Sequence, residues 1–225
     1  MAQRFVAELE GFRESLLEMA SLVLEQVERA VKSWEDQDPN LAAGVVANDE
    51  VVDELCVTLE QRIFDIHLHD APVAGDLRLL HVGLIGTIAL ERVGDLAVSI
   101  SRLVESVNRL PAVPSIQSLI RRMSARAVDG LHQAVQAVAH GDVELGERAA
   151  READDVRALL DQLVQAAGAE APDDAGARVW LASAVLVGRH LERVSNNGRE
   201  LGGRVRFLTT GEPFRRASHQ TGVEA

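Results

Sequence analysis

Residues 30–59 read AVKSWEDQDPNLAAGVVANDEVVDELCVTL, and residues 134–163 read AVQAVAHGDVELGERAAREADDVRALLDQL. Set side by side without a gap, the two stretches agree at a starting Ala-Val pair, at one Asp and at four aliphatic positions. The matched pairs are Ala30 and Ala134, Val31 and Val135, Asp38 and Asp142, Leu41 and Leu145, Val52 and Val156, Leu55 and Leu159, and Leu59 and Leu163. The string Leu-Glu-Arg-Val also occurs twice, at residues 90–93 and 191–194, at nearly the same offset. This repetition predicts two tandem copies of one structural unit.

The apolar spacing in the first copy predicts long helices. Over residues 5–34, apolar side chains recur every three or four positions, which is the period of an amphipathic helix. Asp38 is placed to cap a second helix that has Pro39 at its first position. The apolar stripe of this second helix runs out at residues 69–72.

The third helix of the first copy should be the most enclosed. It is expected to begin at about residues 75–76, where Asp76 is placed to cap it, and to continue to about Val107. Between residues 79 and 100 its apolar side chains cover nearly every angle, so other helices should surround it. Charged residues interrupt the same run, which would make crossing a bilayer costly.

Residues 108–115 are expected to link the two copies, because they contain Pro111 and Pro114 and keep no helical period. The predicted fold is all-α, with six long helices in two tandem three-helix bundles. The first unit is expected to span residues 1–110 and the second residues 111–210. Residues 211–225 are expected to form a flexible tail.

The composition indicates an intracellular protein that acts by binding partners. Its net charge of -12 opposes contact with nucleic acid or with an anionic membrane surface. One cysteine, Cys56, permits no internal disulfide, as a reducing compartment would allow. Residues 1–14 lack the basic start and apolar centre of a signal peptide. Neither a Gly-rich phosphate loop nor a nucleophile elbow occurs in the sequence, so binding is expected rather than catalysis.

Two pairs of acidic residues, each four positions apart, are candidate metal ligands. Glu91 and Asp95 share one face of the third helix in line with apolar residues, so both are expected to point into the core. Asp49 and Asp53 have the same spacing at the edge of the second helix's apolar stripe. A buried carboxylate needs an Arg, a proton or a metal ion to offset its lost hydration. The four side chains would suit a hard or borderline cation, and the alternative is a structural ion network with neighbouring arginines.

Three strings of the sequence together resemble the PhoU family of phosphate-uptake regulators. They are APVAGDLR at residues 71–78, LERVGD at residues 90–95 and LTTGE at residues 208–212. The resemblance implies a cytoplasmic accessory protein that links the ATPase subunit of a phosphate ABC transporter to a sensor histidine kinase. In that role it would hold phosphate-starvation genes off when phosphate is plentiful. The resemblance further implies a homodimer that meets the membrane only through its partners.

The resemblance also implies a metal site. Some family members hold multinuclear clusters of iron or other metals on acid-x-x-x-Asp motifs. Asp49 with Asp53, and Glu91 with Asp95, match those motifs in the first unit. Iron, zinc, manganese and magnesium all stay open as the ion for this chain.

The second unit departs from the motif. Ala153 and Arg157 stand where the acids of its middle helix are expected, and Asn196 replaces the Asp that should follow Glu192. At most one well-formed site is therefore expected, in the first unit, with Glu192 as a weaker candidate. Two alternatives stay open. One is a di-metal oxidase of the helical-bundle type, which the lack of paired Glu-x-x-His motifs disfavours, and the other is a metal-free helical scaffold.

Overall fold

The computed structural model describes residues 2–69, 72–170 and 172–212 and shows α-helices joined by short connections. The helices of the first half are α1 (Ala2–Asp36), α2 (Pro39–His69), α3 (Ala74–Arg102) and the short α4 (Val104–Val107). Those of the second half are α5 (Pro114–His140), α6 (Val143–Glu170), α7 (Ala175–Gly203) and the short α8 (Val205–Thr210). Within these described ranges there is no β-strand, so the predicted all-α class with six long helices is confirmed.

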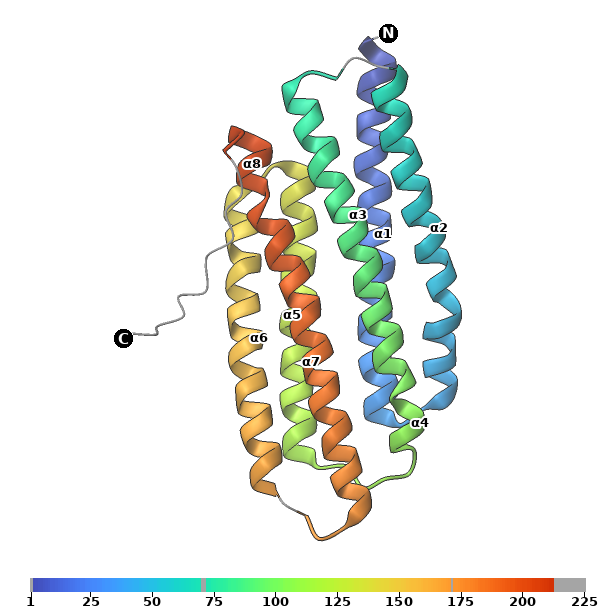
Figure 1. Cartoon of the computed structure of the whole chain (residues 1–225), viewed down its shortest axis with the longest axis vertical. Coiled ribbons are helices and arrows are strands. Elements are labelled where there is room, and N and C mark those ends of the chain that lie inside the picture. The colour runs from blue at the N-terminus through green and yellow to red at the C-terminus, as the bar shows by residue number, and fades with distance from the viewer. Residues whose placement is uncertain (1, 70–71, 171, 213–225) are drawn as a thin grey trace, which may run out of the picture.

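The long helices form two groups of three that lie side by side (Figure 1). Helices α1, α2 and α3 pack together, as do α5, α6 and α7, and the two groups meet where α1 packs on α5 and α3 packs on α7. Helices α2 and α6 therefore lie at opposite outer edges (Figure 1). The unit boundaries at residues 1–110 and 111–210 stay a prediction. Of the predicted tail, only Gly211 and Glu212 lie within the described residues.

A side-chain cap starts each of the two middle helices, and the sequence predicts the first of them. Asp38 Oδ1 accepts the backbone N–H groups of Asn40 at 2.9 Å and Leu41 at 3.2 Å, so the predicted cap of α2 is confirmed. Asp142 Oδ1 accepts the N–H of Leu145 at 3.0 Å at the matching position before α6. The repeated Asp therefore has the same structural role in both copies.

Asp76 does not cap α3 in the predicted way. The helix begins at Ala74, before the expected start, so Asp76 lies inside its first turn. Its Oδ2 reaches back to accept the backbone N–H of Val73 at 3.2 Å. Asp76 thus still pairs one of the donors that a helix start leaves free, although the residue that precedes the helix is Val73.

The predicted continuous helix to Val107 was wrong, because α3 ends at Arg102 and α4 begins at Val104. The N–H of Leu103 bonds to the carbonyl of Ile100, three residues back, at 3.1 Å, and this tighter turn interrupts the α-helix. Val104 and Val107 are nevertheless buried, so the apolar pattern continues across the break. Apolar spacing alone therefore gives no signal for this turn.

The buried core is mostly aliphatic, with two tryptophans where the two groups of helices meet. Trp34 on α1 and Trp180 on α7 are both fully buried, and their ring centroids lie 4.8 Å apart. The Trp34 indole Nε1 donates a hydrogen bond to Ser183 Oγ at 2.9 Å. This contact joins the first helix of one group to the last long helix of the other.

Across the described part of the chain, the helices offer no segment of the length and apolar character that a bilayer crossing requires.

Candidate functional site

The four acidic candidates of the first unit lie on two neighbouring helices. Asp49 and Asp53 belong to α2, and Glu91 and Asp95 belong to α3, which packs against it. Asp49 and Glu91 are half-buried, whereas Asp53 and Asp95 are exposed. These four residues are named the acidic face below.

The prediction that both acids of α3 point into the core was wrong for Asp95, which is exposed. Leu84 and Ile88, which share its side of the helix, are themselves only partly buried. This side of α3 is therefore the border of the core, where a side chain can reach water. Glu91 lies deeper on the same border and is half-buried.

Partial burial and the neighbouring carboxylates together shift the pKa values of two acids of this face. Burial raises the pKa of Asp49 above its ordinary value, and the charges of Asp53 and Asp95 raise it further. Burial likewise raises the pKa of Glu91, with added contributions from Asp95, Asp53 and Asp49 that outnumber the opposing one from Arg92. Arg102 lowers the pKa of Asp49, as Arg92 does that of Glu91, but the net direction of both shifts is upward. A cation at this face would offset the burial and the repulsion that raise them.

Cys56 lies close to the same negative field. Burial raises the pKa of its thiol to about 11, and the charges of Glu60, Glu91 and Asp53 contribute to the rise. A thiol with this pKa is protonated at neutral pH, and the protonated form is a poor nucleophile. The chemistry of the acidic face is therefore that of oxygen donors.

The acidic face is not a preformed metal cage. Nowhere in the described ranges do three or more His, Cys, Asp or Glu side chains gather closely enough to hold a metal ion. Drawing the four acids of this face together requires side-chain rotation on α2 and α3, which their partial exposure permits.

Two features of the packing fit a cation at this face. A Cβ atom added to Gly94 of α3 would lie 3.1 Å from Asp49 Oδ1 and 3.3 Å from Gln26 Oε1. The absence of a side chain at Gly94 therefore lets a carboxylate oxygen and an amide oxygen approach the same point of α3, with Val52 Cγ1 beside them at 3.4 Å. In addition, the amide oxygen and nitrogen of Gln26 are buried without a hydrogen-bond partner. Oxygen donors around a small space suit a hard divalent cation.

Gln26 was missed by the sequence reasoning. It lies on α1, and only 5% of its surface is exposed. The available signal was its place within the apolar stripe, directly before Val27 and three residues after Val23, both fully buried. One polar residue in such a stripe is common, so spacing alone could not connect it with acids on two other helices.

In the second unit, the acid equivalent to Glu91 is Glu192, and its carboxylate already has hydrogen-bond donors from the protein. Glu192 is buried, and its carboxylate accepts hydrogen bonds from Arg189 Nη1 at 2.8 Å and from Asn196 Nδ2 at 2.9 Å. The Asn that replaces the motif Asp thus supplies a donor to the remaining acid. Ala153 is buried and Arg157 is exposed on α6, so neither supplies an oxygen ligand. Glu192 as a metal ligand stays a prediction, and its pairing with two donors speaks against it.

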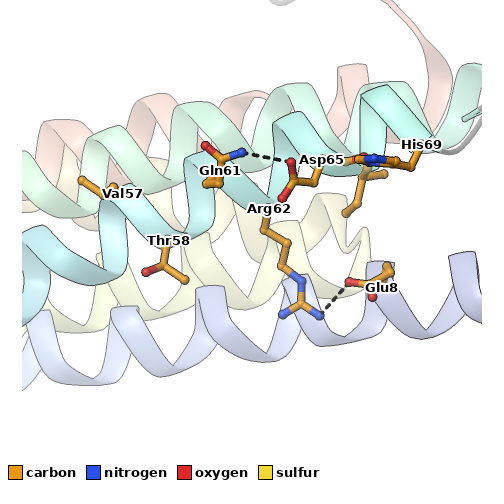
Figure 2. Close-up of a pocket in the computed structure, with 8 residues that line it drawn as sticks. Glu8, Val57, Thr58, Gln61, Arg62, Asp65 and His69 are labelled. Atoms are coloured by element: carbon orange, nitrogen blue, oxygen red, sulfur yellow. Dashed lines mark hydrogen bonds and ion pairs between the residues drawn. The ribbon is translucent and has the colours of Figure 1, made fainter.

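A groove of about 600 Å³ lies between α1 and the last turns of α2 (Figure 2). Its polar side chains engage one another: Arg62 Nη2 bonds to Glu8 Oε2 at 3.2 Å, and Gln61 Nε2 bonds to Asp65 Oδ1 at 2.9 Å. Figure 2 shows both contacts along the walls of the groove. None of the sequence-predicted acids lines it, so it adds no ligand to the candidate site.

Neutralising Asp49 and Glu91 is expected to stabilise the fold at neutral pH. Since folding raises both pKa values, the folded chain binds more protons than the unfolded chain between the ordinary and the raised values. The stability that these groups contribute therefore falls as pH rises through this window and stays low above it. At about pH 7 in chelator, we expect the double variant Asp49→Asn, Glu91→Gln to melt about 2–4 °C above the native chain, an effect of about 1 kcal/mol.

The same difference should shrink toward about pH 4, where the native carboxyl groups are themselves protonated. Melting curves followed by circular dichroism across this pH range measure it. Asp161→Asn, which changes an exposed acid of α6, is the control and should leave the melting temperature unchanged. A double variant that melts below the native chain at neutral pH would contradict the repulsion described above.

Known proteins resemble this chain along nearly its whole length. The family model of the PhoU domain matches residues 16–104. The chain is 29% identical over 216 residues to the "Phosphate-specific transport system accessory protein PhoU" of Serratia marcescens, covering 94% of this chain and 87% of that protein. It is 28% identical over 216 residues to the protein of the same name from Escherichia coli strain K12, covering 94% of this chain and 88% of that protein.

Solved structures show the same arrangement of helices. The crystal structure of PhoU from Pseudomonas aeruginosa matches with a TM-score of 0.85 at 26% identity, covering 92% of this chain and 99% of that one. The phosphate transport system regulatory protein PhoU from Streptococcus pneumoniae matches with a TM-score of 0.84, covering 95% of this chain and 100% of that one. The second match, at 19% identity, shows the fold alone.

Proposed function

Because the chain belongs to the PhoU family, we propose that it is an accessory regulator of phosphate uptake. In this proposal it links the ATPase subunit of a phosphate ABC transporter to a sensor histidine kinase, from the cytoplasmic side of the membrane. It holds phosphate-starvation genes off when phosphate is plentiful, and it acts as a homodimer. The observation that supports this most is the agreement of sequence and fold along both units with PhoU accessory proteins.

The surface of the structure suits a protein that binds other proteins. Val57, Phe64 and Leu68, on the outer helix α2, each expose 60% or more of their surface. Exposed apolar side chains of this size on one helix are typical of interaction surfaces. The net charge of -12 favours partner surfaces that are basic.

Loss of the chain is expected to release phosphate-starvation genes from repression. A strain that lacks its gene should express phosphatase constitutively in medium rich in phosphate, because the signal from transporter to kinase is broken. Phosphatase activity per cell at high and at low phosphate measures this, and restoring the native gene should restore repression. Unchanged repression in the deletion strain would overturn the regulatory proposal.

The acidic face has a place in this proposal as a divalent-cation site. Asp49, Asp53, Glu91 and Asp95 would hold the ion through carboxylate oxygens, and the positive charge would offset the repulsion that raises two of their pKa values. The ion would fasten α2 to α3 as a structural element. Metal content of protein purified without chelator, compared with that of Asp95→Ala and Glu91→Ala, tests for the site. An oxidase assay with ferrous iron separates this role from that of a di-metal enzyme.

A further inference from the structure

Gln26 has an amide group that the fold buries and leaves unpaired. Only 5% of the residue is exposed, and both Oε1 and Nε2 lie buried without a hydrogen-bond partner. Most buried polar groups in proteins are hydrogen-bonded, because burying an unpaired one is costly. A leucine of similar length would fit the apolar stripe of α1 without that cost. Packing of the core therefore does not account for a glutamine at this position.

The amide oxygen points toward the acidic face. Gln26 Oε1 and Asp49 Oδ1 both lie against Gly94, at 3.3 and 3.1 Å from the point where a Cβ would lie, together with Val52 Cγ1 at 3.4 Å. The two oxygens come from α1 and α2, and they meet at one position of α3. A second groove, of about 190 Å³ between α1 and α2, also borders Gln26. Gln26 thus lies close to Asp49 and also borders a surface groove, although its amide atoms are themselves buried.

We infer that Gln26 Oε1 is a neutral ligand of the divalent cation at the acidic face, beside Asp49 and opposite Gly94. The inference rests on the metal site proposed above and extends it from two helices to three. An amide oxygen is a common ligand of hard cations, and it adds a donor without adding another negative charge to four acids that already repel each other. Gly94 is required because a Cβ there would lie within 3.3 Å of both oxygens and would push them away.

The second unit supports this assignment by what it lacks. Under the gap-free repeat, the position of Gln26 is taken by Gly130, and the position of Asp49 by Ala153. On the last long helix, Ser195 stands in place of Gly94, and Asn196 in place of Asp95. The amide, the glycine and three of the four acids are therefore missing together from the copy whose remaining acid, Glu192, is satisfied by protein donors.

The test is Mn²⁺ binding to the full-length chain, measured by isothermal titration calorimetry after removal of bound metal with chelator. Gln26→Leu is expected to weaken Mn²⁺ binding by about tenfold or more, the size of effect that supporting groups at metal sites have. Gln26→Glu keeps the oxygen and adds a charge, so it should tighten binding. Gln133→Leu is the matched control, because Gln133 of α5 also has a buried, unpaired amide oxygen but lies in the second unit.

Thermal unfolding in chelator separates a ligand from a structural residue. Gln26→Leu should melt at or above the temperature of the native chain, because it removes two buried unpaired polar atoms. Equal Mn²⁺ affinity of the native chain and Gln26→Leu would overturn the inference and leave the metal site intact. A lower melting temperature of Gln26→Leu in chelator would overturn it too, by showing a structural partner for the amide. A native chain that binds no Mn²⁺ would overturn both the inference and the proposed metal site.

Discussion

Gly146→Ala is expected to lower the melting temperature by about 5–10 °C, a loss of about 2–3 kcal/mol, although alanine is the better helix former. Gly146 lies on α6 at a point where the backbone of α7 comes close to it. A Cβ added to it would lie 2.5 Å from the backbone carbonyl oxygen of Gly202, and one added to Gly202 would lie 2.8 Å from the carbonyl oxygen of Gly146. Backbone atoms cannot rotate away as a side chain can, so the two helices would have to separate.

The matched control is the same substitution on the same helix. Gly168 of α6 has no atom within 4 Å of an added Cβ, so Gly168→Ala should raise stability by about 0.5–1 kcal/mol through helix propensity alone. Melting curves of the two variants, followed by circular dichroism, should therefore shift in opposite directions. Equal shifts of the same sign would show that α6 and α7 do not cross as closely as the structure places them.

Local signals explain which parts of the fold could be predicted from the sequence. The gap-free repeat and the cap at Asp38 depend on residues near each other in the chain, and the structure confirms the cap and six long helices. The turn at Leu103 was missed because Val104 stays buried, so apolar spacing is the same with and without it. Periodicity reports which side of a helix faces the core and not whether each turn is α-helical.

The candidate site shows the limit of the same reasoning. The i, i+4 spacing correctly placed Glu91 and Asp95 on one side of α3, but only the packing of α2 against α3 determines how deep that side lies. The donors around Glu192 could not be predicted either, because a replacement of Asp by Asn looks like the loss of a ligand. In the structure, the Asn196 amide donates a hydrogen bond to the acid that remains. Gln26 needed three helices in place before its oxygen could be connected with Asp49.

Trp34→Ala is expected to have the largest effect of any single truncation at the contact between the two groups of helices. Trp34 is fully buried, its ring lies 4.8 Å from that of Trp180, and its Nε1 donates to Ser183 Oγ. Truncating a buried tryptophan costs about 3–5 kcal/mol, which corresponds to a melting temperature lower by about 6–20 °C in a chain of this size. Ser183 would also lose the indole donor that its hydroxyl accepts from.

Differential scanning calorimetry of Trp34→Ala also tests how the two units depend on each other. Buried residues of both units belong to one continuous apolar cluster, and α1 packs on α5 while α3 packs on α7. We therefore expect a single cooperative transition at a lower temperature, because the remaining contacts still couple the halves. Two separate transitions would show units that fold independently once the tryptophan contact is lost. Val179→Ala, an exposed change beside Trp180 on α7, should leave the transition in place. A melting temperature for Trp34→Ala within about 2 °C of the native value would contradict the role assigned to this contact.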